Sequence, residues 1–142
     1  MRYLELCTLT DSQIADLLGQ MKELNAGLTV TEQMQRRAVA APGTRIFCAE
    51  NDEKHIVGCA TLYVYESPTG RKASVEDVVV SSAYRGQGIG RTLLQRIIDF
   101  AGSKLSPIDL HLTSSPSRVE ANALYKALGF EQRDTNVYKM SL

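Results

Sequence analysis

The sequence has no excess of charge of either sign. Its 16 Lys and Arg residues balance its 16 Asp and Glu residues, so the formal net charge at neutral pH is zero. Strongly basic surfaces attract nucleic acids and anionic membranes through their electric field. We therefore expect no nucleic-acid partner, and any anion-binding site has to be built locally from a few residues.

Long apolar runs are missing as well. A membrane-spanning helix needs roughly 18 or more consecutive apolar residues, and no such stretch is present. Residues 1–30 do not combine a basic start, an apolar run and a small-residue cleavage site, which together mark a secretory signal. The sequence predicts a cytoplasmic protein with no membrane partner.

Paired cysteines are also absent. Cys7, Cys48 and Cys59 lie far apart and form no CxxC motif, whereas disulfide frameworks and zinc sites need such pairs. We expect buried, reduced thiols and no metal. A chain of 142 residues with 44% hydrophobic and 23% charged residues fits one domain, 1–142.

The apolar periodicity predicts a mixed α/β fold with one parallel part. Strands rich in β-branched, aromatic or alternating apolar residues are expected at 3–7, 44–50, 56–65, 74–80 and 108–112. Helices are expected from Thr10 or Asp11, from 29–31 to 40, through 93–101, and over 118–128 with Gly129 as the C-terminal glycine. Residues 130–142 are expected to supply one or two closing strands.

A glycine-rich loop lies between a run of valines and an amphipathic helical segment. It reads Arg85-Gly86-Gln87-Gly88-Ile89-Gly90-Arg91. A strand that leads through such a loop into a helix points several backbone N–H groups at one spot, with the positive end of the helix dipole behind them. Glycine keeps this spot free of Cβ atoms and permits positive φ. The pattern predicts a phosphate-binding loop, with Arg85 and Arg91 as additional donors.

Spacing separates three kinds of phosphate loop. A nucleoside-triphosphate loop, GxxxxGK[ST], would need glycine at Arg85 and lysine at Arg91. A dinucleotide fingerprint, GxGxxG, would need its third glycine at Arg91. The third pattern, RxxGxG, fits Arg85, Gly88 and Gly90 without a mismatch.

The RxxGxG loop resembles the acetyl-CoA pyrophosphate loop of the GNAT superfamily of N-acetyltransferases. A second motif follows in the order typical of that family, a helix that carries a tyrosine and ends in Gly-Phe. Here it is RVEANALYKALGF, with Tyr125, Gly129 and Phe130. The resemblance implies the GNAT fold, a mostly antiparallel sheet with helices on its faces and two parallel strands that splay apart.

The same resemblance implies acetyl-CoA as co-substrate and a set of residues that bind it. Its pyrophosphate would lie on the loop from Arg85 to Arg91, and its pantetheine arm would pair with the preceding strand. The strand residues are Val78, Val79 and Val80. On the last helix, Arg118 stands where many members have asparagine, and Asn122 lies three residues before Tyr125; both are expected to contact the cofactor.

Acetyl transfer to an amine needs a base, since a free amine has a pKa of ~10 and is protonated at neutral pH. Glu76 is the first candidate; strand alternation would place Asp77 on the opposite face. Asp77, His111 and a water relay remain alternative bases, although a lone strand histidine is more often structural. Tyr125 is the candidate acid that protonates the leaving thiolate.

The acceptor is not identified by the sequence. Residues 75–80 also resemble a strand of glucosamine-phosphate N-acetyltransferases, but the resemblance is lost by Ser114-Ser115-Pro116, so the sugar phosphate is not carried over. Acceptor pockets of this fold correspond to 24–31 and 132–137, and small-molecule or protein amines both remain open, as does a homodimer. The alternative function is an inactive acyl-CoA-binding regulatory module.

Overall fold

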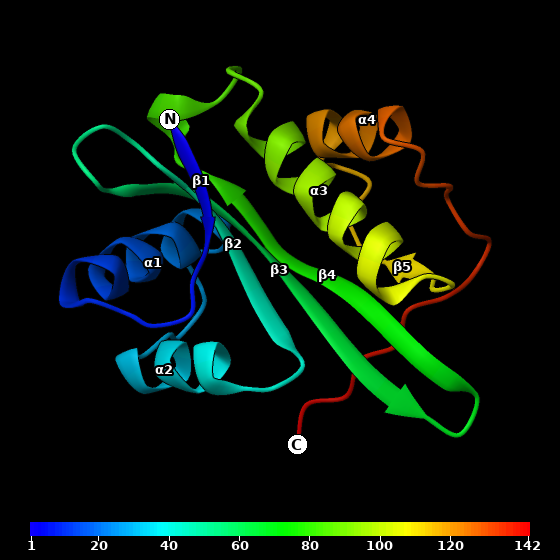
Figure 1. Cartoon of the computed structure of the whole chain (residues 1–142). Coiled ribbons are helices and arrows are strands. Elements are labelled where there is room, and N and C mark those ends of the chain that lie inside the picture. The colour runs from blue at the N-terminus through cyan, green and yellow to red at the C-terminus, as the bar shows by residue number, and fades with distance from the viewer. The chain divides into compact units, whose positions relative to one another are not determined.

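A computed structural model describes residues 1–142 as two compact units, 1–112 and 113–142. Unit 1 contains the sheet and three α-helices, and unit 2 contains one α-helix and the C-terminal segment (Figure 1). The assignment of both units to one domain stays a prediction. None of the helices is long and apolar enough to cross a bilayer.

The sheet of unit 1 has five strands in the order β1-β2-β3-β4-β5. The strands are β1 (Arg2–Glu5), β2 (Thr44–Glu50), β3 (Ile56–Ser67), β4 (Gly70–Val80) and β5 (Leu110–His111). The first three pairings are antiparallel, and β4 pairs with β5 in parallel. The predicted mixed α/β class, mostly antiparallel with one parallel pair, is confirmed.

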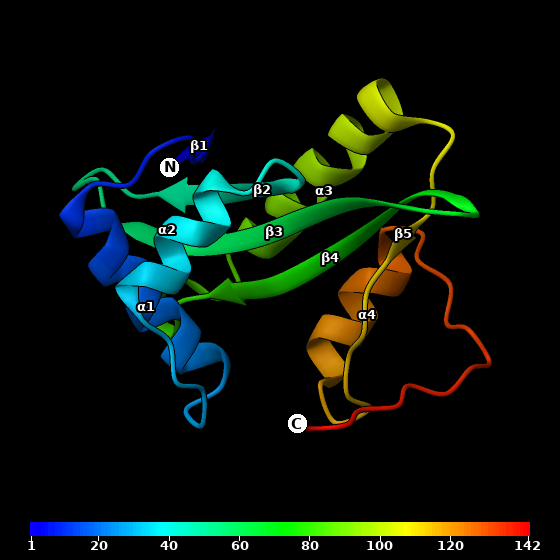
Figure 2. The same cartoon turned by 90° about the horizontal axis from the view of Figure 1, so that it is seen from below.

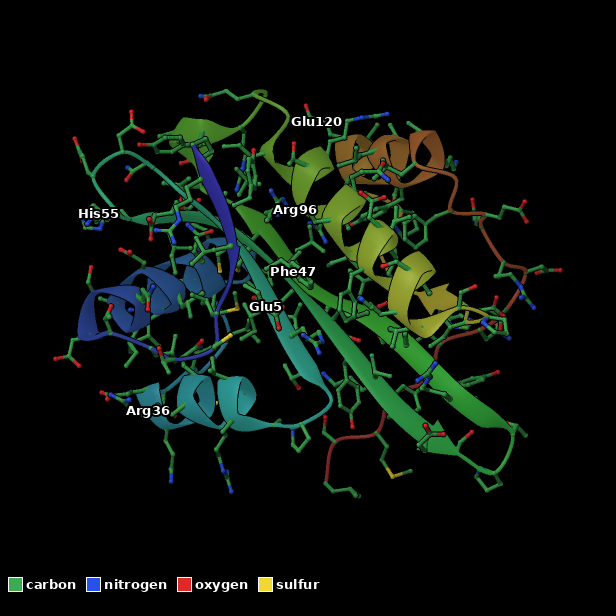
Figure 3. All side chains as sticks on the ribbon, viewed as in Figure 1. Glu5, Arg36, Phe47, His55, Arg96 and Glu120 are labelled. Atoms are coloured by element: carbon green, nitrogen blue, oxygen red, sulfur yellow. The ribbon has the colours of Figure 1, made fainter.

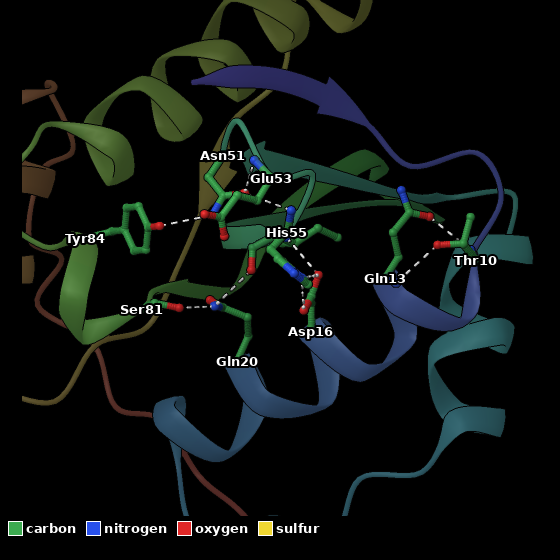
Figure 4. A network of polar contacts seen from close by, with 10 residues as sticks. Thr10, Gln13, Asp16, Gln20, Asn51, Glu53, His55, Ser81 and Tyr84 are labelled. Carbon is green, nitrogen blue, oxygen red and sulfur yellow. Dashed lines mark hydrogen bonds and ion pairs between the residues drawn. The ribbon is translucent and has the colours of Figure 1, made fainter.

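Two helices precede the long hairpin, and both begin where the sequence predicts. Helix α1 (Asp11–Leu24) has Thr10 as its N-cap: Gln13 N–H donates to Thr10 Oγ1 over 3.2 Å, and Thr10 N–H donates to Gln13 Oε1 over 3.0 Å (Figure 4). Helix α2 (Glu32–Ala40) is capped by Thr31. These side chains satisfy N–H groups that have no partner within the helix.

Helix α3 (Ile89–Phe100) covers the face of the sheet opposite to α1 and α2 (Figure 2). Its apolar residues Leu93, Leu94 and Ile97 are fully buried. A Cβ at Gly58 of β3 would lie 3.2 Å from Ile89 Cγ2 and 3.4 Å from Leu93 Cδ1. The missing side chain therefore lets the first turn of α3 approach the sheet closely, which fixes where this helix begins.

Two predicted strands differ from the structure. Strand β5 has only two residues, Leu110 and His111, and pairs with Ala73 and Ser74 of β4. The closing strands predicted in 130–142 are wrong, because this segment forms no strand. Residues 131–136 are all polar and lack the alternation that a half-buried strand needs.

Candidate functional site

A β-bulge interrupts β4 next to the candidate base. Glu76 pairs with Thr61 of β3, and Val79 pairs with Cys59, so the register shifts between them. Asp77 has φ +50, a left-handed conformation at the first position of the bulge. Because cross-strand partners share a face, Glu76 and Val79 lie on one face although they are three residues apart. The bulge therefore breaks the strict alternation of this strand after Asp77, whereas the opposite faces expected for Glu76 and Asp77 stay a prediction; both side chains are exposed.

The two carboxylates of the bulge interact with each other. Partial desolvation raises the pKa of Asp77, and the negative charge of Glu76 raises it further. Ser74 Oγ donates to Glu76 Oε1 over 2.5 Å, which orients this carboxylate. Neither acid forms an ion pair within the chain. The bulge therefore offers uncompensated negative charge and proton-accepting oxygens to a solvent-exposed ligand.

The raised pKa of Asp77 predicts a pH-dependent gain of stability in Asp77→Asn. A carboxyl group with a raised folded-state pKa stabilises the fold below its unfolded pKa of ~3.9, and that contribution is lost as pH rises through the folded pKa. Asparagine does not ionise, so the free energy of unfolding does not decrease in this way as pH rises. It also tolerates the positive φ of this position. We expect a higher Tm than wild type at pH 7 and no difference near pH 3, measured by thermal unfolding. A Tm difference independent of pH would contradict this.

The glycine loop lies open in front of the first turn of α3. Gly86 (φ +76) and Gly88 (φ +78) are both left-handed, a conformation that costs other residues ~1–2 kcal/mol. A Cβ built on either would have no heavy atom within 4 Å, so packing does not demand glycine there. Gly88 is the N-cap of α3 and supplies no side-chain cap. The first N–H groups of the helix are thus free for an anion.

The side chains around this loop divide into two groups. Gln87 and Arg91 are exposed and free to reach a ligand. Arg85, in contrast, donates its Nε to the carbonyl of Val80 over 2.9 Å. Its Nη2 lies 3.6 Å from Glu23 Oε2 at the end of α1. The guanidinium of Arg85 is therefore held against the strand that precedes the loop.

One edge of β4 is unpaired beyond Ser74. The pairing with β5 covers only Ala73 and Ser74, so Val78, Val79 and Val80 have no partner strand on that side, although Val80 O accepts from Arg85 Nε. Ser81 N–H donates to Val57 O of β3; since backbone groups alternate between the two sides of a strand, those of Val80 point away from β3. Val79 is buried in the core. The open edge can take an extended ligand as an additional strand.

Unit 2 builds the surroundings of Tyr125 from one helix, α4 (Val119–Ala127). Gly129 (φ +100) ends it, with Phe130 N–H donating to Tyr125 O and Gly129 N–H to Lys126 O. This is a Schellman motif, and its apolar contact is the edge-on packing of the Tyr125 and Phe130 rings at 6.1 Å. The Tyr…Gly-Phe spacing thus places the ring of Tyr125 against Phe130 at the C-terminal end of α4.

The phenol of Tyr125 sits in a protected environment. Tyr125 is buried, and burial raises its pKa, while the nearby positive charge of Arg118 lowers it in part. Arg118 is the N-cap of α4. Asn122 donates its Nδ2 to Ser115 O over 3.0 Å and so ties the helix to the preceding turn. A buried phenol with a raised pKa keeps its proton at neutral pH and can donate it.

The structure places the predicted site residues in both units. Glu76, Val78 to Val80 and the loop from Arg85 to Arg91 share the end of β4 and the start of α3 in unit 1, whereas Arg118, Asn122 and Tyr125 share α4 in unit 2. His111 pairs with Ser74, the residue that donates to Glu76. Glu23 was not predicted, because no local pattern shows a contact with residues about 60 positions away.

Comparisons with known proteins agree with this geometry. The profile of the "Acetyltransferase (GNAT) family" matches residues 13–130. Glucosamine 6-phosphate N-acetyltransferase of Trypanosoma brucei brucei is 30% identical over 139 residues, 92% of this chain and 91% of that protein. Rat N-acetyltransferase 8B is 33% identical over 91 residues, 63% of this chain but only 40% of that longer protein. A solved structure, a putative acetyltransferase from Agrobacterium tumefaciens str. C58, superposes with a TM-score of 0.83 at 25% identity over 99% of this chain and 100% of that chain.

Proposed function

Because this chain belongs to the GNAT family of acetyltransferases, we propose roles for its residues in moving an acetyl group from acetyl-CoA to an amine nitrogen. N-acetyltransferase activity follows from the family and from the relative that covers nine tenths of both chains. The observation that carries the residue roles is the open glycine loop beside the unpaired edge of β4. The acceptor and the partition of roles are proposals.

The residues of unit 1 fit the two anchor points of acetyl-CoA. Backbone amides from Gly86 to Arg91 hold the diphosphate, since positive φ and open space at Gly86 and Gly88 let its oxygens reach them. The free edge from Val78 to Val80 holds the pantetheine arm by strand-like pairing. Arg118 and Asn122 add contacts from α4. Bound acetyl-CoA supplies the acetyl group as a reactive thioester.

Glu76 is the proposed general base. Its carboxylate is exposed, oriented by Ser74, and close to a second acid, Asp77. The uncompensated charge attracts an ammonium group, and one carboxylate then accepts its proton before the nitrogen attacks. Asp77, His111 and a relayed water are the alternative bases. Tyr125, with its raised pKa, is the proposed donor to the departing thiolate.

An amine panel tests the function and separates it from an inactive acyl-CoA-binding module. The panel includes glucosamine 6-phosphate and thialysine, which the names of two relatives suggest. CoA release is followed by thiol detection. An enzyme releases CoA with at least one amine, whereas a binding module binds acetyl-CoA and releases CoA with none. A protein that neither binds acetyl-CoA nor releases CoA would contradict both the enzyme and the binding-module hypotheses.

Glu76→Gln should lower turnover on the active amine by at least ~10²-fold, the typical contribution of a general base, without weakening acetyl-CoA binding. Glu53→Gln, at an exposed position in the β2–β3 turn, is the matched control and should keep wild-type turnover. Turnover is measured by CoA release, and binding by calorimetry. Unchanged turnover in Glu76→Gln would transfer the role to Asp77, His111 or water.

The acceptor is proposed to be a small-molecule or protein amine that contacts 24–31 and 132–137. The glucosamine 6-phosphate of the trypanosomal relative is one specific proposal within that class. A homodimer and a cytoplasmic location also stay predictions. Binding of acetyl-CoA does not require the homodimer, because all of the proposed contacts come from a single chain.

A further inference from the structure

The C-terminal half of α1 contacts the residues that precede the glycine loop. Gln20 is buried, and its Nε2 donates to Ser81 Oγ and, over 3.5 Å, to Ile56 O of β3 (Figure 4). Asn51, which lies between β2 and β3, donates its Nδ2 to Tyr84 OH over 3.0 Å (Figure 4). The short 3₁₀ turn Ser82–Tyr84 is thus held from two sides before the loop begins.

Glu23 adds a different kind of contact, because it carries charge. Its Oε2 accepts from Ser82 N–H over 2.9 Å and lies 3.6 Å from Arg85 Nη2. Arg85 Nε in turn donates to Val80 O over 2.9 Å. Glu23, Ser82, Arg85 and Val80 form what we call the Glu23 clamp, which joins α1, the end of β4 and the first residue of the loop.

The loop needs such a clamp because its own sequence gives little rigidity. Glycines at Gly86, Gly88 and Gly90 leave the backbone free to adopt many conformations, and binding sites lose affinity when their donors are not pre-organised. The α3 end of the loop is fixed by the packing of Ile89 and Leu93 on Gly58. The Glu23 clamp is the corresponding fixed point at the β4 end.

We propose that Glu23 is a positioning residue for acetyl-CoA: acting through Arg85 and Ser82, it holds the loop amides in the conformation that binds the diphosphate. This proposal rests on the proposed function of the loop. In this proposal Arg85 holds the start of the loop in place. Its guanidinium points toward Val80 and Glu23, and the carboxylate of Glu23 offsets its positive charge. A loop whose arginine served mainly as a free cation for phosphate would bind more tightly once Glu23 lost its charge.

Two substitutions divide the contacts of Glu23. Glu23→Gln keeps an oxygen that accepts from Ser82 N–H, so the turn stays folded, but it removes the charge opposite Arg85. Glu23→Ala removes both. We expect KM for acetyl-CoA to rise several-fold in Glu23→Gln and about tenfold or more in Glu23→Ala, as for lost hydrogen bonds to charged groups, with kcat within about twofold of wild type.

Glu32→Gln on α2 is the matched control. It breaks a comparable pair of exposed residues on α2, in which Arg36 Nη2 lies 2.8 Å from Glu32 Oε1; Figure 3 labels Arg36 on this helix. KM for acetyl-CoA should stay at the wild-type value. Since α2 is not part of the clamp, an equal rise in this variant would show that loss of surface charge alone causes the effect.

A double-mutant cycle shows whether Glu23 acts through Arg85. In the Arg85→Gln background, Glu23→Gln should change KM for acetyl-CoA by less than half of its effect in wild type. Unchanged or lower KM in both Glu23 variants, or full additivity with Arg85→Gln, would overturn the proposal. Wild-type protein that binds no acetyl-CoA would instead contradict the function of the loop, so the two failures are distinguishable.

Discussion

Gly88→Asn should lower the affinity for coenzyme A by at least ~10²-fold while the protein stays folded. Asparagine tolerates the left-handed conformation of Gly88, φ +78. Its side chain would fill the space in front of the loop, where a Cβ now meets nothing within 4 Å. Loss of two amide hydrogen bonds to charged oxygens, each worth ~1.5–3 kcal/mol, gives this magnitude.

Calorimetric titration with coenzyme A measures the effect, and Gly19→Ala is the matched control. Gly19 lies on α1, where an added Cβ also meets nothing within 4 Å and φ is not positive. Alanine there should leave affinity unchanged and stabilise the helix by ~1 kcal/mol. A folded Gly88→Asn protein that binds coenzyme A as tightly as wild type would show that the diphosphate does not lie on this loop.

The sequence predicts those parts of the fold that depend on short-range patterns. The helix starts expected at Thr10 or Asp11 and within 29–31, and the end of α4 at Gly129, follow from residue types at short spacing. The structure confirms these expectations and identifies Thr10 and Thr31 as the caps. The glycine loop is equally local, because positive φ and a following apolar helix can both be read from neighbouring residues. Family membership follows from the same loop together with Tyr125 and Phe130.

Features that depend on distant residues could not be predicted in this way. The bulge at Asp77 exists only as a register shift against Cys59 and Thr61 of β3, and an alternating strand pattern gives no sign of it. The orientation of Arg85 depends on Glu23, which belongs to another helix. The motif therefore identifies Arg85 as part of the loop, whereas the proposed positioning role of Arg85 follows from its contacts with Glu23 and Val80.

Tyr125→Phe should lower kcat by ~10²-fold or more, the typical contribution of a general acid, and leave the dissociation constant for acetyl-CoA unchanged. Phenylalanine keeps the ring that packs on Phe130 at 6.1 Å, so the end of α4 stays intact. Only the hydroxyl, the proposed donor to the leaving thiolate, is lost. Single-turnover CoA release measures the chemical step, and Tyr3→Phe, on β1, should behave as wild type.

The pH dependence of the ratio between wild-type and Tyr125→Phe turnover distinguishes a proton donor from a packing residue. Burial raises the pKa of Tyr125, so the hydroxyl is protonated throughout the neutral range and becomes ionised only above its ordinary value of ~10. The ratio should therefore be constant from pH 6 to about pH 9 and fall toward one at higher pH, as wild type loses its acid. A packing role would leave the ratio the same at every pH at which both proteins are folded, because ring contacts with Phe130 do not titrate.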